Sequence, residues 1–252
     1  RPGKARRASV GTLAMIDVTQ AMGSLPTRNN REVQFEGTNK LNPAAMKTKR
    51  RSDGRANLLA NKACFACTIG CGRIALIDPT HFSVRGRQMG PSGGLEYESG
   101  LALGSLLGVD DMEADTYANF VCNEHGMDPI SFGGTLSAAM ELFETGVLTE
   151  KDTGGVPLTF GSAQALVTMV DQTARGEGFG AELGLGSKRL CDKYGHPEFS
   201  MAVKGQEFPG YDGRAMQGMA LAYATSNRVP CPPPASPFAP DFFRPHAAPN
   251  AT

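Results

Sequence analysis

The sequence predicts a mostly α, multihelical fold. Segments with apolar residues at helical spacing outnumber strand candidates by about five to one. Several of these segments end at a glycine, which favours a helix C-terminus, and one begins with Asp110 and Asp111, where the helix dipole favours acids. A chain of 252 residues, 40% of them hydrophobic, is long enough to bury a core between such helices.

The expected elements follow one another closely along the chain. The first helix is predicted over residues 12–23, where Leu13 and Ile16 share one face and Gly23 ends the pattern. Residues 31–60 are polar and basic, and the run KTKRRSDGR, residues 47–55, is expected to be solvated. Further helices are predicted at residues 96–108, 110–126, 129–146, 160–178, 181–195 and 214–227. The sequence EFSMAVKG, residues 198–205, predicts a short strand.

The composition gives no electrostatic support for binding to nucleic acid or to an anionic membrane. The 25 Lys and Arg residues balance 25 Asp and Glu residues, so the formal net charge is zero. No apolar run reaches the roughly 18 residues of a membrane span, and no signal peptide is recognisable. Clustered cysteines in such a chain are typical of metal or redox groups, so we expect a cytoplasmic protein.

The chain divides at Arg228 into two parts of different composition. Residues 1–228 form the predicted helical region, whereas residues 229–252 are rich in proline, which prevents a packed helix. This composition predicts a disordered or extended tail. We interpret the abrupt change as a truncated or frame-shifted product, with a genuine alternative C-terminus as the rival interpretation.

Three of the six cysteines lie within eight residues, as Cys64, Cys67 and Cys71 in the sequence CFACTIGC. Thiolates bind soft or borderline metals, and the CxxCxxxC spacing lets three sulfurs converge on one centre. The spacing favours a [4Fe-4S] cluster, because bacterial ferredoxins contain it, and it reverses the order found in radical S-adenosylmethionine enzymes. A zinc site with a distant fourth ligand and unmetallated thiols are the alternatives, and spacing alone does not decide between them.

The sequence around the three cysteines resembles the tungsten-pterin aldehyde ferredoxin oxidoreductase family. The matching stretches are GTLAMIDVTQAMGSLPTRNN, ACFACTIGCGR, the long segment from GLEYESG to FETGVLT, and VKGQEFPGYDGRAMQGMALAYATSNR. They occur in the family's order and cover roughly residues 10–228. The resemblance implies a fold similar to the helical C-terminal domains 2 and 3 of that family, and it assigns Cys64, Cys67 and Cys71 to a [4Fe-4S] cluster.

A second motif of the family falls between two predicted helices. The segment NEHGMD, from Asn123 to Asp128, is similar to the first of two short pterin-binding motifs. Gly126 and Asp128 match the motif, whereas Asn123 replaces its leading Asp and Met127 replaces Leu. In the role that the resemblance implies, Asp128 accepts hydrogen bonds from pterin N–H groups and Gly126 lets the backbone come close. The alternative for Gly126 is a helix C-cap.

Two glutamates correspond to the family's PEYE-like segment near the tungsten site. They are Glu96 and Glu98, with Leu95 where Pro is usual. A glutamate in a closed, partly apolar pocket has a raised pKa and could pass a proton during aldehyde oxidation. The alternative is that both residues simply begin a helix.

Three other chemically reactive residues are given structural interpretations. Cys122 and Cys191 lie among apolar residues at helical spacing, so each is predicted to be a small buried hydrophobe. His125 follows in the last turn of a predicted helix, so it is predicted to be an exposed residue that favours the helix C-terminus.

The resemblance implies an enzyme that oxidises an aldehyde to a carboxylate at a tungsten or molybdenum bis-pterin. Electrons would leave through the cluster to ferredoxin, and the family also allows a homodimer. The family's N-terminal domain, fourth cluster cysteine, second pterin motif and Gly-Ala-Cys-His segment have no match here, and Cys231 is interpreted as a coincidental remnant. We therefore expect this chain to need the missing parts of the enzyme for activity. The alternative function is a zinc-binding or structural helical domain without catalysis.

Overall fold

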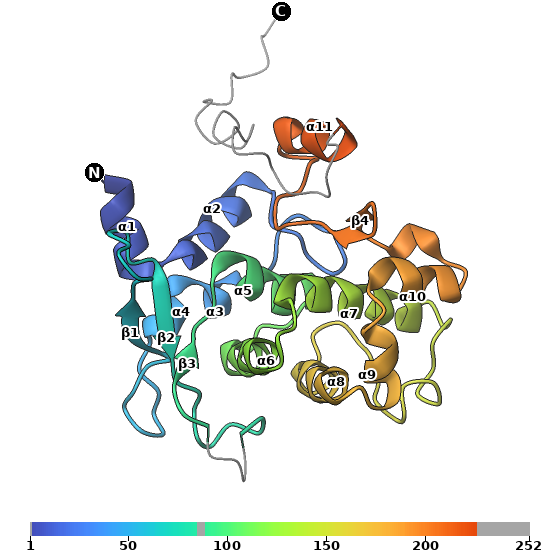
Figure 1. The fold of residues 1–252 in the computed structure, drawn as a ribbon, viewed down its shortest axis with the longest axis horizontal. Helices are drawn as coiled ribbons and strands as arrows, with labels where there is room; N and C mark the ends of the chain where they lie inside the picture. Colours follow the sequence, from blue (N-terminus) through green and yellow to red (C-terminus); the bar gives the residue numbers. More distant parts are fainter. Residues whose placement is uncertain (1, 85–88, 226–252) are drawn as a thin grey trace, which may run out of the picture.

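The computed structural model describes residues 2–84 and 89–225, and the fold is mostly α (Figure 1). The predicted tail of residues 229–252 and Cys231 lie outside the described residues. The helices of the described part are α1 (Pro2–Val10), α2 (Met15–Met22), α3 (Thr38–Leu41), α4 (Pro43–Lys47), α5 (Tyr97–Leu103), α6 (Met112–His125), α7 (Pro129–Glu144), α8 (Ala163–Arg175), α9 (Gly178–Leu183), α10 (Ser187–Lys193) and α11 (Gln217–Thr225). Short 3₁₀ turns occupy Thr12–Ala14, Ser105–Leu107 and Pro197–Phe199.

Two small antiparallel sheets complete the described fold. The first contains β1 (Leu58–Lys62), β2 (Gly72–Ala75) and β3 (Ser92–Gly93), and the second contains β4 (Ala202–Val203) and β5 (Gln206–Glu207). The short strand predicted at residues 198–205 is present only as the two-residue β4, because the start of that range belongs to the 3₁₀ turn Pro197–Phe199. Strand β1 pairs with β2 in a hairpin whose register joins Lys62 to Gly72. The nine residues between them form the tip of the hairpin, which lies beside α1 (Figure 1).

The long helices begin and end where their sequences provide caps. The side chain of Asp111 accepts hydrogen bonds from the first turn of α6, and that of Asp128 does the same for α7. Gly126 ends α6 with a φ of 67°, a left-handed conformation that glycine adopts without strain. These ends confirm the predicted helices at 110–126 and 129–146.

Other boundaries differ from the prediction. The single helix expected over residues 181–195 is instead divided into α9 and α10, because Gly186 adopts a φ of 82° between them. The run KTKRRSDGR, residues 47–55, is solvated as predicted, since all of its residues except the half-buried Arg50 are exposed. The polar and basic segment 31–60 also contains α3, α4 and most of β1, and α1 is a helix that the pattern did not predict.

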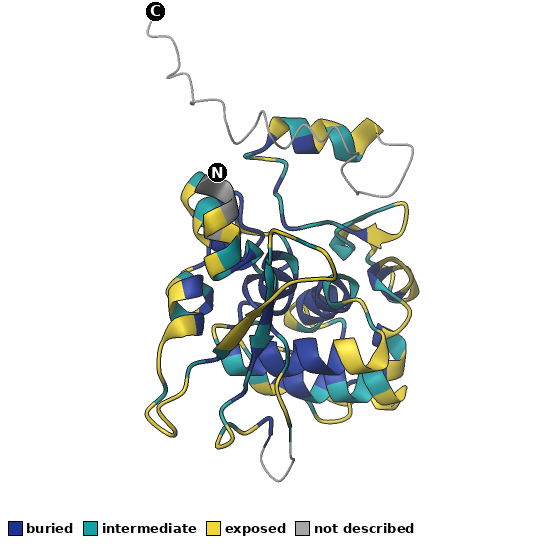
Figure 2. Ribbon diagram, turned by 60° about the vertical axis from the view of Figure 1, so that its left-hand side comes forward, coloured by how far each residue is buried: buried dark blue, intermediate teal, exposed yellow. Residues whose placement is uncertain are grey.

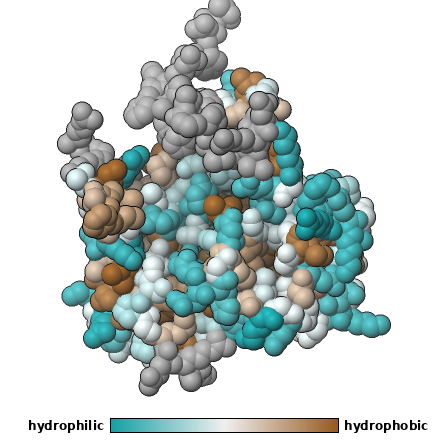
Figure 3. All heavy atoms as spheres, in the orientation of Figure 1, coloured by the Kyte–Doolittle hydropathy of each residue, from teal (hydrophilic) through white to brown (hydrophobic). Residues whose placement is uncertain are grey.

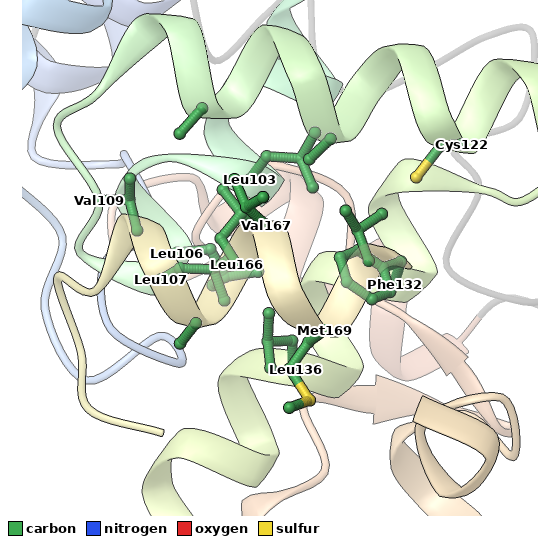
Figure 4. Packing of buried hydrophobic residues seen from close by; sticks show 14 of the residues in the cluster. Leu103, Leu106, Leu107, Val109, Cys122, Phe132, Leu136, Leu166, Val167 and Met169 are labelled. Atoms are coloured by element: carbon green, nitrogen blue, oxygen red, sulfur yellow. The ribbon is translucent and has the colours of Figure 1, made fainter. Parts of the chain in front are cut away.

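The core lies between α5, α6, α7 and α8. Helix α6 packs on α8, and α5 packs on α7. Figure 4 shows leucine, valine, phenylalanine and methionine side chains interdigitating there, among them Leu103, Phe132 and Leu166, which are at most 5% exposed. Figure 2 shows the same contrast across the molecule, with dark, buried helices at the centre and the exposed strand β1 at its side. Cys122 and Cys191 are fully buried, as predicted, and burial raises the pKa of each thiol to about 12.

The contact between α5 and α7 depends on a glycine. A Cβ atom at Gly133 would lie 2.2 Å from the carbonyl oxygen of Ala102, which is backbone and cannot move aside without displacing the helix. Glycine therefore sets the distance between the two central helices.

We predict that Gly133→Ala destabilises the protein by about 2–4 kcal/mol, because the helices must separate and lose core packing. Urea unfolding monitored by circular dichroism measures the change. Gly90→Ala is the matched control, because a Cβ there meets nothing within 4 Å. Equal stability of Gly133→Ala and the wild type would contradict this account of the helix contact.

One buried carboxylate in the core has no hydrogen-bond partner among the described residues. Asp115 lies on α6 with no exposed surface, and neither of its oxygens is paired. Burial, and then repulsion from Asp111 and Asp110, raises its pKa well above the ordinary value. The folded protein therefore favours the neutral form of Asp115 more strongly than the unfolded chain does.

This difference predicts a pH-dependent loss of stability. From the pKa of an unfolded Asp, about 4, up to the raised folded pKa, each pH unit lowers the free energy of unfolding by up to about 1.4 kcal/mol. Asp115→Asn removes this contribution, so its stability advantage over the wild type should grow as pH rises from 4 to 7. Urea unfolding at each pH measures the difference. A difference that stays constant as pH rises would overturn the prediction.

Candidate functional site

The three clustered cysteines lie together at the tip of the β1–β2 hairpin. The tip turns tightly, because the amide of Cys67 donates to the carbonyl of Cys64 over 3.0 Å and Ala66 and Gly70 have positive φ angles of 56° and 62°. Cys64 is exposed and Cys67 and Cys71 are half-buried, and none of the three forms a disulfide with another described residue. Within residues 2–84 and 89–225, no three Cys, His, Asp or Glu side chains are arranged to hold a metal ion.

Phe65 is fully exposed between the first two of these cysteines. Residues 58–75 contain no acidic residue, so the tip combines thiols, apolar surface and the positive charge of Lys62. Such a surface favours an acidic partner over a basic one.

Behind the tip lies a buried arginine. The guanidinium of Arg73 donates to the carbonyls of Arg7 (2.6 Å) and Gly72 (2.5 Å), and its Nε has no partner among the described residues. Burial lowers the pKa of Arg73, and the nearby charges of Glu96 and Cys71 act in the opposite direction. A buried cation with an unused donor beside a thiol is suited to an anionic group at the cysteines.

A cavity of about 560 Å³ joins the cysteine tip to the start of α5. Its walls include Arg7, Cys71, Glu96, Glu98 and Tyr211. The structure thus brings one predicted cluster ligand and both predicted glutamates into one space.

Glu96 begins α5 and is held by a dense set of hydrogen bonds. Its side chain forms a capping box with Ser99, whose hydroxyl accepts from the Glu96 amide over 3.0 Å. The hydroxyl of Thr12 also donates to the Glu96 carboxylate. Glu96 therefore has the helix-starting role that was the alternative interpretation from sequence.

Glu98 stands in a different environment two residues further along α5. Burial, the largest influence, raises its pKa to about 7. Hydrogen bonds from the Gly210 amide (2.8 Å) and from the Tyr211 hydroxyl lower the pKa, and the charge of Asp128 raises it. A carboxyl that titrates near neutrality is suited to accept and release a proton at physiological pH.

Tyr211 is a site residue that the sequence did not single out. Its hydroxyl is hydrogen-bonded to Glu98, and its ring centroid lies 5.3 Å from that of the buried Tyr97, whose own hydroxyl donates to the Gly210 carbonyl. The only available signal is its place within PGYDGR, part of a stretch that resembles the family.

The predicted pterin motif lies apart from this cavity. Asn123 is exposed, Gly126 is the C-cap of α6, and Asp128 caps α7 through a 3.0 Å bond from the Ile130 amide. Met127 and Asp128 line a separate cavity of about 170 Å³. The charge of Asp128 nevertheless acts on Glu98.

His125 is exposed in the last turn of α6, as predicted. The capping role weighed as an alternative for Gly126 is also the one observed.

The family model for aldehyde ferredoxin oxidoreductase, domains 2 and 3, matches residues 1–250 of the chain. The chain belongs to the aldehyde ferredoxin oxidoreductase family. Similar proteins include the tungsten-containing aldehyde ferredoxin oxidoreductases of Thermococcus kodakarensis, 40% identical over 222 residues, and of Pyrococcus abyssi, 39% identical over 224 residues. Each alignment covers 88% of this chain and 34% of the relative, so the chain spans about a third of the length of these oxidoreductases.

A solved structure supports the fold alone. The active-site complex BamBC of benzoyl coenzyme A reductase, with 1,5-dienoyl-CoA, matches with a TM-score of 0.61 and 14% identity. The match covers 85% of this chain and 31% of that one. Among the described residues of this family member, no helix has both the length and the apolarity required to cross a membrane.

The Tyr211–Glu98 contact predicts a measurable shift in this family member. Tyr211→Phe removes a hydrogen bond that favours the ionised carboxylate, so the titration midpoint of Glu98 should rise above 7. Carboxyl ¹³C NMR measures the midpoint, with Glu98→Gln assigning the signal. Tyr194→Phe, which removes a 2.8 Å bond to Glu182, is the control and should leave the midpoint unchanged. A midpoint that stays in place in Tyr211→Phe would contradict the assigned contact.

Proposed function

We propose that this chain is part of an enzyme that oxidises an aldehyde to a carboxylate at a tungsten or molybdenum bis-pterin. The observation that carries the proposal is the cavity that joins Cys71 of the thiol tip to the half-buried Glu98, in a chain of this family. Because the chain spans about a third of its relatives, activity would require the remaining parts of the enzyme.

Cys64, Cys67 and Cys71 would hold a [4Fe-4S] cluster, with a fourth ligand from elsewhere. Three cysteines on one tight turn supply the donor chemistry that iron–sulfur clusters require. The buried guanidinium of Arg73, with its unused Nε, would offset the negative charge that the thiolates and cluster bring. The cluster, when bound, supplies one-electron transfer, and ferredoxin would be the acceptor that docks on the apolar, basic tip.

Glu98 would hold and move a proton at its carboxyl oxygen. Its pKa of about 7 lets it accept a proton at neutral pH, and Tyr211 orients it by a hydrogen bond. Glu96 would support the site by fixing the start of α5.

Asn123, Gly126, Met127 and Asp128 would hold one pterin. The support is the motif resemblance together with the exposure of Asn123 and Asp128 and the electrostatic reach of Asp128 to Glu98. When bound, the metal pterin supplies the two-electron oxidation of the aldehyde.

A zinc-binding or structural domain is the second candidate function. The arrangement of the three cysteines at the hairpin tip supports it. Two of the three cysteines are half-buried on a tight turn, which a tetrahedral zinc site with a distant fourth ligand would also use.

Metal content separates the two functions. We predict that Cys67→Ser, purified without oxygen, loses more than half of the iron per chain and the absorbance at about 400 nm, because oxygen is a harder ligand than sulfur. Cys191→Ala, which changes a buried cysteine remote from the tip, is the control and should keep both. Unchanged iron in Cys67→Ser would remove the cluster assignment, and colourless protein with one zinc per chain would establish the second function.

A further inference from the structure

A basic loop, residues 47–56, runs from the end of α4 towards β1. The chain turns back on itself there, because Lys49 and Ala56 form an antiparallel bridge and the Arg50 amide donates to the Arg55 carbonyl over 2.7 Å. The basic loop precedes β1 and the thiol tip follows it, so the two surfaces lie at opposite ends of this strand (Figure 1). Figure 3 shows hydrophilic residues at the lower left of the molecule, where Figure 1 places the basic loop.

Four basic side chains of this loop are exposed and have no ion-pair partner among the described residues. They are Lys47, Lys49, Arg51 and Arg55. The fifth, Arg50, is half-buried and pairs with Asp53 and Glu113. Like charges that are held together on one short loop repel one another, and an anionic partner would relieve that repulsion.

Arg50 fixes the basic loop to the rest of the protein. Its guanidinium donates to the two carboxylate oxygens of Asp53 over 3.2 and 3.0 Å, and to the Leu76 carbonyl over 2.8 Å. It also donates to Glu113 over 3.3 Å. Because these bonds hold the loop against the segment that follows β2, little further ordering of the loop is needed when a partner docks.

The acidic residues beside the loop are already engaged. Asp53 accepts from the Arg55 amide over 2.9 Å as well as from the guanidinium described above. Asp78 accepts from the Ser52 hydroxyl over 2.7 Å, and Glu113 accepts from the Asp78 amide over 2.8 Å. These carboxylates therefore stabilise the loop itself and leave its four exposed cations uncompensated.

A cavity of about 570 Å³ lies beside the basic loop. Asp53 and Arg55 line its polar side, and its apolar side includes Leu76, Ile77 and Val84. No aromatic side chain is among its described lining residues, so it lacks the stacking surface that single-stranded nucleic acid uses. An apolar cavity next to unpaired cations instead suits a peptide that carries carboxylates on either side of an apolar residue.

We propose that the basic loop and this cavity form a docking site for an acidic segment of another protein, in which Asp or Glu residues flank one apolar side chain. The carboxylates pair with Arg51 and Arg55, and the apolar side chain enters the cavity beside Leu76. The inference is independent of the proposed function, because neither the three clustered cysteines nor Glu98 takes part. It gives the chain a protein contact at the end of β1 opposite the thiol tip.

Fluorescence anisotropy with a labelled synthetic peptide tests the proposal on the full chain. The probe has the sequence Glu-Glu-Glu-Leu-Glu-Glu-Glu, and we expect a Kd of about 100 µM or lower in about 50 mM salt. Raising the salt to about 300 mM should weaken binding about threefold or more, because the ions screen the exposed charges. A peptide with Ser in place of the central Leu should bind about fivefold more weakly or worse, because it has no apolar side chain to bury.

A matched pair of double variants locates the binding. Arg51→Gln combined with Arg55→Gln removes two unpaired charges of the basic loop and should weaken the leucine peptide about fivefold or more. Lys151→Gln combined with Arg189→Gln removes the same charge from exposed positions elsewhere and should leave the affinity within about twofold. Circular dichroism of both variants confirms that each is folded.

Four results would overturn the proposal. They are no binding of the leucine peptide, equal affinity for the serine peptide, equal weakening by the two double variants, and tighter binding of a twelve-residue oligothymidylate, which would assign the surface to nucleic acid. Sedimentation of the chain alone tests a second copy as the occupant. A dimer that dissociates only in the basic-loop variant would assign the surface to self-association instead.

Discussion

The close approach of Gly210 to α5 is the constraint on which the site depends. A Cβ atom at residue 210 would lie 1.8 Å from a methyl carbon of Leu101, so only glycine lets the chain touch the helix there. Once in place, the Gly210 amide donates to Glu98 and its carbonyl accepts from Tyr97. These two bonds join residues more than a hundred positions apart, and they hold Tyr211 in the wall of the cavity that contains Glu98.

Local chemistry made part of this fold predictable. Helices α6 and α7 could be predicted because Asp111, Asp128 and Gly126 are caps that act within a few residues of their own positions. The β1–β2 hairpin could not, because β1 is exposed along almost its whole length and shows no alternation. Strand β1 forms because it pairs with β2, and the spacing of apolar residues along the sequence does not reveal such a pairing.

The candidate site also contains residues that the sequence could predict and one that it could not. Its thiols and glutamates follow from short motifs, whereas Tyr211 gains its role from a partner 113 positions away. Two residues of the predicted pterin motif also have local structural roles, since Gly126 and Asp128 cap helices whether or not a pterin is bound. A cap and a ligand contact are compatible, because the Asp128 carboxylate remains exposed although its oxygens accept from the Ile130 amide and the Ser131 hydroxyl.

The two glutamates of α5 resemble each other in sequence and differ in chemistry. Glu96 has its carboxylate engaged by the helix N-terminus and by Thr12, an arrangement that keeps it fixed as a structural acceptor. Glu98 is half-buried, accepts hydrogen bonds from Gly210 and Tyr211 and has a pKa of about 7, so both its protonated and ionised forms are accessible at neutral pH. A carboxyl group whose environment brings its pKa near neutrality is suited to acid–base chemistry. Our proposal therefore gives proton transfer to Glu98 and gives Glu96 the role of holding the start of α5.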